Sequence, residues 1–460
     1  MKILLVKPYN LSDHIQPSLG LGYLATSVRE RHEVKIIDCV KEGIAPRSFY
    51  KILDREKPDV VGIQCYTYDM HNVGHILKQC KDRSITTVLG GPHPSAMPVD
   101  TMIAFEGDLD YLFHGESEIG LKSLLGSLET GNISGLGDIP GLVWRNKGVV
   151  CMNDKYFETD IDKLGMPAWD MIKPDTYPEA QHGAFFKKFP IAPIMTTRGC
   201  PYSCTFCAGN LIGGKRIRKR SVPAIIEEIQ LLYNDFGIRE FHIVDDNFTF
   251  DSAFAKDLLR TLRGLELDIS WAVPNGVRID ALDEELLDLM KDTGLYLISL
   301  GIESGSDKVL RLMRKNTTIE KIKRAVEMIR SHGIDIAGFF IIGFPGETIE
   351  DIKKTMDLSL ELDLLRANFF TYLPFPGTES YDNLKREGRL SKLDFKKFYF
   401  MNATFTPEGI NKGTLKRLQQ KAFLKFFLRP HILFRNISQI RSVNHFKFLA
   451  KRFLRWMFIK

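Results

Sequence analysis

The sequence lacks the features that would place the protein in a membrane or outside the cell. It has no uncharged apolar run of roughly 18 residues, the length that a membrane-spanning helix requires. The apolar start MKILLV is interrupted at Lys7 and Pro8, too early for a secretory signal. Cysteine is scarce, with seven among 460 residues, and an odd, scattered set favours a reducing compartment over a disulfide framework. These absences predict a cytoplasmic protein.

Acidic residues are missing from one part of the chain only. Residues 409–460 hold thirteen Lys and Arg and no Asp or Glu. The rest of the chain carries 50 basic and 57 acidic residues, a net charge of −7, although the whole chain has a net charge of +6. The basicity is therefore local, and it raises the question of a partner for the tail rather than for the whole protein.

The first 135 residues alternate strand and helix patterns. Continuous Val, Ile and Leu runs separated by amphipathic stretches predict a parallel sheet covered on both faces, an α/β doubly wound domain over residues 1–135. The expected strands are Ile3–Val6, Val34–Ile37, Val60–Ile63, Thr86–Leu89 and Tyr111–Phe113. Such sheets bind ligands beyond the carboxyl ends of their strands. Gly90 and Gly91 follow one of these strands, where a ligand could approach the backbone closely.

The remainder divides into a linker, a second α/β domain and a tail. Residues 136–190 are predicted to be a linker that contains a hairpin, GLVWRNKGVV, with its turn at Asn146–Gly148. From residue 191 to 405, six strand–helix units predict a partial (β/α)6 TIM-like barrel with its chemistry at the carboxyl ends of the strands. The expected strands are Ala192–Thr197, Phe241–Val244, Ile269–Val273, Leu297–Gly301, Gly338–Ile342 and Asn368–Tyr372. Residues 406–460 form the basic helical tail.

Three cysteines lie close together directly after the first expected barrel strand. The segment TTRGCPYSCTFCAGN places them at Cys200, Cys204 and Cys207. Thiolates are the ligands of iron–sulfur clusters, and three ligands on a 4Fe–4S cluster leave one iron open to a chelating small molecule. A zinc site is the competing interpretation, but structural zinc takes four ligands and no fourth Cys or His lies near.

The segment RGCPYSCTFC resembles the signature of radical S-adenosylmethionine (radical SAM) enzymes. The resemblance implies that the three cysteines hold a 4Fe–4S cluster, which cleaves S-adenosylmethionine to start radical chemistry. It also implies that Phe206 packs on the adenine and that Glu303 and Ser304, in GIESGS, face the ribose and aminocarboxylate groups. Gly343 and Pro345, in GFPGE, resemble the turn that closes on the adenosyl group. On physical grounds alone, Glu303 could instead be a buried acid paired with Arg278 or Arg314.

The segments VVGIQCYTYD, VLGGPHPSAMP and DYLFHGESE resemble the cobalamin-binding class of radical SAM proteins. The resemblance covers most of the chain and implies that the corrin lies at the carboxyl edge of the first sheet. Gly90 and Gly91 would then contact the cofactor, and His93 would line the cobalamin cleft without binding cobalt. A generic flavodoxin-like module is the alternative, while the absence of GxGxxG after the first strand argues against a dinucleotide site.

One short pattern resembles a cobalt-binding motif but lies in the wrong loop. Residues 69–74 read DxHxxG, which supplies an axial histidine in other cobalamin proteins. There the motif follows the first strand, whereas His71 follows the third. The first-strand loop contains His14 without the pattern. We therefore expect the cobalt to lack a protein histidine ligand.

Together these resemblances imply cobalamin-dependent radical methylation of an unactivated carbon. An oxidative cyclase or other ring-forming enzyme with the same cofactors is the alternative, and a non-enzymatic cobalamin sensor disagrees with the intact cysteine set. The implied partners are a small-molecule substrate and an electron donor such as flavodoxin or ferredoxin.

The basic tail interleaves large apolar residues with Lys and Arg. Phe446, Leu449, Phe453 and Met457 keep helical spacing, which is typical of an interfacial helix on an anionic membrane. A helical cap packed on the barrel is the second interpretation, and nucleic acid is the least favoured partner. Peripheral membrane association would favour a lipid-like or isoprenoid substrate.

Overall fold

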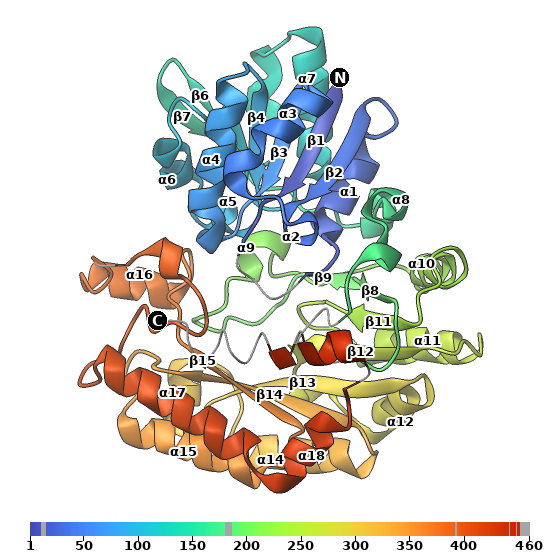
Figure 1. Cartoon of the computed structure of the whole chain (residues 1–460), viewed down its shortest axis with the longest axis vertical. Coiled ribbons are helices and arrows are strands. Elements are labelled where there is room, and N and C mark those ends of the chain that lie inside the picture. The colour runs from blue at the N-terminus through green and yellow to red at the C-terminus, as the bar shows by residue number, and fades with distance from the viewer. Residues whose placement is uncertain (11–14, 180–185, 392, 441, 448, 451–460) are drawn as a thin grey trace.

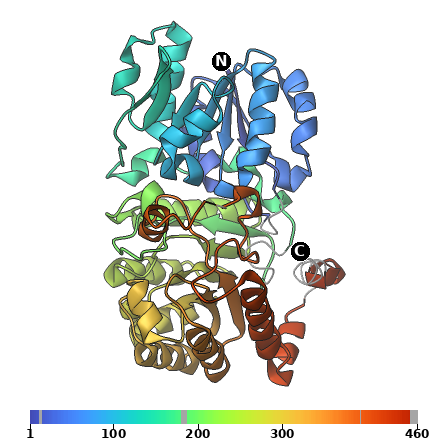
Figure 2. The ribbon, with the colours of Figure 1, turned by 90° about the vertical axis from the view of Figure 1, so that its left-hand side faces the viewer.

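The computed structural model describes residues 1–10, 15–179, 186–391, 393–440, 442–447 and 449–450. Two α/β units are stacked one above the other, with the chain entering the lower unit after residue 190 (Figure 1). The C-terminal helices run along one side of the lower unit (Figure 2). This arrangement confirms the expected α/β fold class.

The first sheet has seven strands in the order β2-β1-β3-β4-β5-β6-β7, the first five of them parallel. Residues of β1 alternate between two cores, with Leu4 and Val6 against α3 and α4 and with Ile3 and Leu5 against α1 and α7. The strands are β1 (Lys2–Lys7), β2 (Glu33–Asp38), β3 (Val60–Gln64), β4 (Thr86–Gly90), β5 (Tyr111–Phe113), β6 (Leu142–Asn146) and β7 (Val149–Met152). The helices are α1 (Leu19–Val28), α2 (Cys39–Glu42), α3 (Tyr50–Glu56), α4 (Met70–Lys81), α5 (Pro92–Ala96), α6 (Pro98–Ala104) and α7 (Glu118–Thr130).

The expected hairpin forms, and it extends the first sheet. Strands β6 and β7 pair antiparallel around the turn at Lys147 and Gly148, as the sequence predicts. Strand β6 also pairs antiparallel with β5. The sequence assigned this hairpin to the linker, but its hydrogen bonds join it to the first unit. Helix α8 (Trp169–Ile172) follows it.

The second sheet has six parallel strands in the order β15-β14-β13-β12-β11-β8 and is not closed into a full barrel. Its strands are β8 (Ile191–Ile194), β11 (Glu240–Ile243), β12 (Ser270–Val277), β13 (Leu295–Glu303), β14 (Asp335–Ile342) and β15 (Arg366–Thr371). A two-stranded ribbon, β9 (Thr197–Arg198) with β10 (Arg218–Lys219), follows β8. The outer helices are α10 (Val222–Asp235), α11 (Ser252–Arg263), α12 (Glu284–Asp292), α13 (Asp307–Leu312), α14 (Ile319–Ser331) and α15 (Ile349–Glu361). Helices α9 (Asn210–Gly213) and α16 (Glu379–Arg386) lie in loops.

Two strand ends differ from the expectation for local reasons. The expected first barrel strand breaks at Thr196, because its N–H and hydroxyl donate to the Asp245 carboxylate instead of continuing a ladder. The segment Pro274–Gly276, expected in a loop, lies within β12, where the register shifts between Val273 and Val277.

Part of the basic tail is a cap on the barrel. Helix α17 (Lys412–Phe427) buries Leu415, Ala422 and Phe426 in the barrel core, and α18 (Pro430–Ile437) adds Ile432. The cap interpretation is therefore confirmed for these two helices. Among the described residues no helix is long and apolar enough to cross a membrane. Phe453 and Met457 of the expected terminal helix lie outside the described residues.

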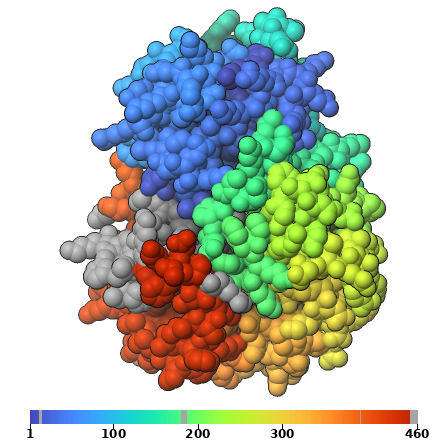
Figure 3. All heavy atoms as spheres, turned by 45° about the vertical axis from the view of Figure 1, so that its right-hand side comes forward, coloured from blue at the N-terminus to red at the C-terminus, as the bar shows by residue number. Residues whose placement is uncertain are grey.

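Beyond α18 the tail crosses toward the start of β8. Gln439 accepts a hydrogen bond from Arg366 of β15, and Ser442 donates to Glu179. The His445 ring packs against Phe186 with 4.8 Å between ring centres. Red atoms of the C-terminal segment accordingly border the green atoms of the segment before β8 (Figure 3). The tail thus reaches both edge strands of the incomplete barrel.

Candidate active site

The three cysteines lie in the loop between β9 and α9, at the mouth of the barrel. All three are free thiols, and each lies close enough to act electrostatically on another. Burial raises the pKa of the Cys200 thiol and raises the pKa of Cys207 to about 11. The Gly209 N–H points at the Cys207 sulfur, 3.4 Å away, and would stabilise a thiolate there.

The cysteine arrangement fits a multi-iron cluster better than a single ion. Within the described residues no three Cys, His, Asp or Glu side chains converge on one point at metal-binding distance. A 4Fe–4S cluster needs no such convergence, since each cysteine binds a different iron. Cys200, Cys204 and Cys207 would hold the cluster.

Aromatic and basic side chains surround the cysteine loop. Phe206 is partly buried beside Phe344, with ring centres 6.5 Å apart. Arg278 lies over the Tyr202 ring at 3.7 Å and donates to the Lys315 carbonyl. A flat apolar group and two cations are thus available beside the cluster site, which suits the adenine and carboxylate of S-adenosylmethionine.

Glu303 ends β13 and is paired with a residue that the sequence did not suggest. Its carboxylate accepts from Lys315 at 2.7 Å, both side chains being mostly buried. Of the two expected partners, Arg314 pairs with Glu379 and Arg278 with Asp280. Burial lowers the pKa of Lys315, but attraction to Glu303 outweighs it and raises that pKa. The pair matches the opposite charges of an amino acid group.

The other residues expected to contact the cofactor, Ser304, Gly343 and Pro345, differ in their burial. Ser304 is fully buried, and its hydroxyl lies 3.2 Å from the Thr355 hydroxyl of α15, so it holds the loop to that helix. Gly343 has φ +83° and donates its N–H to Glu347, while Pro345 lies partly exposed in the same turn. An L side chain at Gly343 would be strained and would meet Leu415.

Glu347 is the last residue of the GFPGE turn, and the sequence predicts no separate role for it. Burial raises its pKa to about 8, although the Gly343 and Phe344 N–H groups donate to one of its oxygens. The other oxygen has no partner among the described residues. The raised pKa favours the protonated carboxyl group, and its hydrogen bonds to Gly343 and Phe344 hold the turn.

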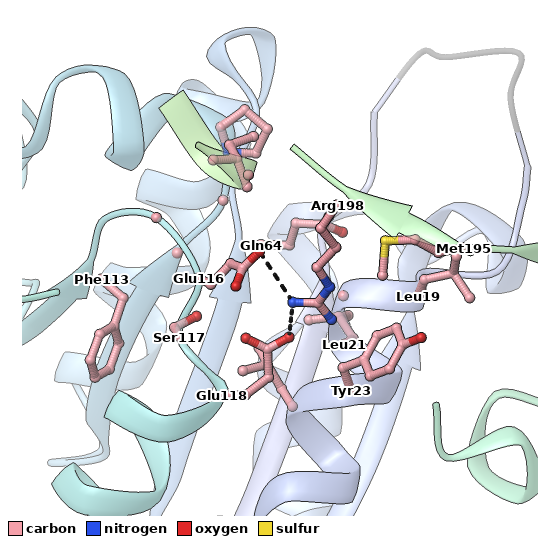
Figure 4. A pocket seen from close by; sticks show the side chains of 18 of the residues that line it. Leu19, Leu21, Tyr23, Gln64, Phe113, Glu116, Ser117, Glu118, Met195 and Arg198 are labelled. Carbon is pink, nitrogen blue, oxygen red and sulfur yellow. Dashed lines mark hydrogen bonds and ion pairs between the residues drawn. The ribbon is translucent and has the colours of Figure 1, made fainter. Parts of the chain in front are cut away.

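A cavity of about 330 Å³ opens between the first sheet and the cysteine loop. Apolar side chains of β1, α1, β4, β5 and α7 line it, together with several glycines and with charged side chains such as Glu116, Arg198 and Asp246. The residues include Leu5, Leu21, Val88, Phe113, Leu121, Gly62, Gly90, Gly91, Gly115, Gly199 and Gly213. Figure 4 shows side chains from both units facing this space. A mainly apolar pocket at the carboxyl edge of a parallel sheet is a typical place for a cofactor to bind.

The two expected glycines lie at this cavity, but His93 does not line it. Gly91 has φ +107°, and a Cβ there would lie 3.1 Å from the Cys65 backbone. His93 is a buried residue of α5, near the Thr67 hydroxyl and the Phe395 ring. Burial lowers its pKa to about 4, so it is neutral. His93 is not among the residues that line this cavity, and its expected place in the cobalamin cleft stays a prediction.

The histidine of the DxHxxG pattern also lies elsewhere. His71 is exposed on α4 and packs edge-on against His75, with ring centres 4.7 Å apart. It borders a separate depression with Phe395 and Lys396. His14 lies outside the described residues.

Four buried charged residues join the two units beside the cavity; we call them the interdomain ion cluster. Arg198 donates to Glu118 at 2.8 Å and lies 3.4 Å from Glu116, which also binds Arg218 at 2.6 Å. The Arg198 guanidinium lies over the Tyr23 ring at 4.7 Å. Burial lowers the pKa of Arg198, but the two glutamates raise it well above its usual value. Figure 4 shows Arg198 between Glu116 and Glu118.

The interdomain ion cluster was not foreseen. Its members are some 80 to 100 positions apart, and no local pattern pairs them. Arg198 directly precedes Gly199 and Cys200, so the base of the cysteine loop is tied to the end of β5. The segments GESE after β5 and RGC after β8 both contain charged residues. Only the fold shows that these charges pair with one another.

Models of two known families match the two units. The radical SAM superfamily matches residues 194–359, and the B12 binding domain matches residues 12–125. A fold of this kind, with three cysteines at the barrel mouth and a cavity facing them, defines a radical SAM enzyme with a cobalamin domain.

Full-length relatives support the same assignment. The chain is 32% identical over 465 residues to an uncharacterized methyltransferase of Pyrococcus horikoshii, covering 99% of this chain and 97% of the relative. It is 31% identical to the cytidylyl-2-hydroxyethylphosphonate methyltransferase of Streptomyces wedmorensis, covering 84% and 82%. The chain belongs to the cobalamin-binding radical SAM family and is an enzyme that uses a 4Fe–4S cluster, S-adenosylmethionine and cobalamin.

The fold agrees with a solved structure. TsrM of Kitasatospora setae, a radical S-adenosylmethionine methyltransferase with cobalamin and a 4Fe–4S cluster bound, superposes with a TM-score of 0.70. The match covers 94% of this chain and 86% of TsrM at 20% identity. At that identity the likeness establishes the fold.

Proposed function

We propose that this protein transfers a methyl group to an unactivated carbon of an apolar small molecule. The observation that carries the proposal is the cavity lined by residues of the first sheet and of the cysteine loop, which supports binding of cobalamin beside the cluster. When bound, the cluster supplies the electron that cleaves S-adenosylmethionine, and cobalamin carries the methyl group. The Pyrococcus and Streptomyces relatives, each matched over more than 80% of both chains, are named methyltransferases, which favours methyl transfer over ring formation.

The chain's own residues would orient S-adenosylmethionine. Glu303 and Lys315 present opposite charges at the end of β13, where they would face the amino and carboxylate groups. Phe206 would pack on the adenine from one side. The Gly343–Glu347 turn, held by Glu347, would close the other side without adding a side chain at Gly343.

The interior of the barrel favours an apolar substrate. Along β14 and β15 the residues Phe340 and Phe369 are buried against the outer helices, so Phe339 and Phe370 point inward. The inward rings lie 5.8 Å apart, and Phe400 lies 4.9 Å from Phe370. Below them Ala272, Leu297, Ala337 and Leu365 fill the barrel floor. Partly exposed aromatic rings above a filled floor suit a lipid-like or isoprenoid molecule better than a charged nucleotide.

The proposal includes two partners. A low-potential electron donor such as flavodoxin or ferredoxin would reduce the cluster. A peripheral membrane contact through the C-terminal helices would bring the barrel to an apolar substrate.

Anaerobic turnover tests the function. Reconstituted protein, given a reductant, cobalamin and S-adenosylmethionine labelled in its methyl group, is incubated with a lipid extract. We expect the label in one apolar product, together with 5′-deoxyadenosine. Formation of 5′-deoxyadenosine and an unlabelled cyclised product would favour the ring-forming alternative.

The cluster assignment has a direct test with a matched control. Changing Cys200, Cys204 and Cys207 to Ala removes every expected ligand, so we expect no cluster by iron analysis and electron paramagnetic resonance. Cys151 of β7 is partly exposed and belongs to the first unit, and Cys151→Ala should keep the full cluster. A cluster retained in the triple variant would contradict the assignment.

A further inference from the structure

Exposed apolar side chains are concentrated on the C-terminal helices. Among the described residues nineteen large apolar side chains are exposed, and seven of these fall between residues 424 and 446. We call these seven the C-terminal apolar surface: Leu424, Leu428, Leu433, Phe434, Ile437, Val443 and Phe446. Side chains scattered singly along a chain need no partner, but such a concentration within one segment favours an interaction site.

The two cap helices, α17 and α18, bury one side in the barrel and expose apolar side chains of this surface on the other. Helix α17 turns Ala422 and Phe426 into the core, while Leu424 and Leu428, one turn apart, lie exposed. Helix α18 buries Ile432 and exposes Phe434, whose side chain is 74% accessible. Both helices lie along the same side of the barrel (Figure 2).

The tail segment that carries this surface has charges of a single sign. Exposed Lys421, Lys425 and Lys447 lie among the apolar residues, and residues 409–460 contain no acidic residue. By contrast, Arg435 turns toward the barrel and pairs with Asp335 and Asp363. The outward cations are therefore left for an external anionic partner.

We propose that the C-terminal apolar surface docks on an anionic lipid membrane. Lysines beside exposed Leu, Ile and Phe complement anionic headgroups over an apolar interior. Nucleic acid offers phosphates but nothing to cover seven large apolar side chains. A second copy packed on the same surface would bring like charges together, since the surface supplies no acidic residue of its own.

The surface is held in place by the barrel. Leu428 lies between α17 and α18, and the hydrogen bonds of Gln439 and Ser442 fix the segment that follows. The apolar residues Phe453, Leu454, Trp456 and Phe458 continue the composition but lie outside the described residues. Docking would hold the open flank of the barrel against the bilayer, where an apolar substrate resides.

The inference rests on the membrane contact in the proposed function, and it is tested without substrate. Full-length holoenzyme is centrifuged with phosphatidylcholine vesicles, with and without phosphatidylglycerol. The variant Leu428→Ser with Phe434→Ser removes two exposed side chains and no core contact. The matched control, Ile133→Ser with Val149→Ser, removes two side chains of similar exposure in the first unit.

We expect the wild type and the control to sediment with the phosphatidylglycerol vesicles, and less so at high salt. The Leu428 and Phe434 variant should bind roughly tenfold or more weakly, because two large apolar side chains no longer insert. Equal binding by this variant, or no binding by the wild type, overturns the inference. A dimer, or binding to duplex DNA, that the same variant abolishes would also overturn it in favour of that partner. In each of these cases the labelled-methyl experiment still decides methyl transfer independently.

Discussion

Removing Arg198 from the interdomain ion cluster should strongly destabilise the protein. In Arg198→Ala, Glu116 keeps Arg218 at 2.6 Å, but Glu118 loses its partner at 2.8 Å. Both side chains of the lost pair are less than a tenth exposed. Leaving one charge of a buried pair alone costs about 3–5 kcal/mol. Because Glu118 borders the cavity, we expect the lower end of this range, about 3 kcal/mol.

An exposed ion pair between the first unit and the segment before β8 is the control. Arg29, directly after α1, binds Asp170 of α8 at 2.7 Å, and both side chains are well exposed. Exposed pairs contribute about 0–1 kcal/mol, so Arg29→Ala should change stability little. The comparison separates the effect of burial on stability from the effect of losing any arginine side chain.

A double-mutant cycle isolates the interaction. Arg198→Met removes the cation and keeps most of the volume, and Glu118→Gln removes the anion. We expect the double variant to lose much less than the sum of the single losses, since no buried charge is left alone.

The assay is urea unfolding of the cofactor-free protein under reducing conditions, followed by fluorescence and circular dichroism. The unfolding transition that includes the interface between the two units should shift to a lower urea concentration in Arg198→Ala. Two results would refute the reasoning: a loss as small as that of Arg29→Ala, or strict additivity in the cycle.

Three further predictions concern the cofactor, pH and the tail. Cob(II)alamin bound to the protein should show no histidine nitrogen splitting in its resonance spectrum, and His71→Ala should leave the spectrum unchanged; a splitting that disappears in the variant would contradict this. The pKa of Glu347 is raised to about 8, so stability should fall as pH rises from about 5 to 8, by up to about 1.4 kcal/mol per pH unit. In Glu347→Gln this fall should be smaller in urea titrations across that range, and an identical slope would show that the carboxyl group is ionised. Deleting residues 441–460 should lower the unfolding midpoint by uncovering Phe186 and Ile191, and an unchanged midpoint would show that this packing adds nothing.

Elements with strong end signals were predictable from sequence. The helical patterns of the sequence predict helices over Ile319–Ser331 and Ile349–Glu361, and α14 and α15 have these bounds. Thr318 and Thr348 cap them, and Thr348 forms a reciprocal pair of hydrogen bonds with Asp351. Local chemistry alone determines these boundaries.

Features that depend on distant partners were not predictable. The end of β8 depends on Asp245, which is 49 positions from Thr196. The partner of Glu303 depends on the turn after α13, which brings Lys315 rather than Arg314 to the strand end. Composition predicts a basic tail. Which of its side chains are buried and which are exposed depends on how the helices pack on the barrel.

The candidate site shows the same difference between features that local sequence determines and features that depend on distant residues. The three cysteines and the glycines of β4 are contiguous patterns with their own chemistry, and the structure places them near one cavity. The interdomain ion cluster and the raised pKa of Glu347 arise from burial, which a sequence does not display.

The open edge of the barrel has a consequence for how the chain is made. An edge strand presents unpaired backbone groups on which another molecule can add a strand. On β15 two of those groups are occupied, since the Gln419 side chain donates to the Phe369 carbonyl and the Thr371 N–H donates to the Phe400 carbonyl. Both partners are synthesised after β15, and Gln419 belongs to the last helices of the chain. Until the ribosome has released them, β15 is a template for aggregation, so truncated or slowly completed chains should need chaperones.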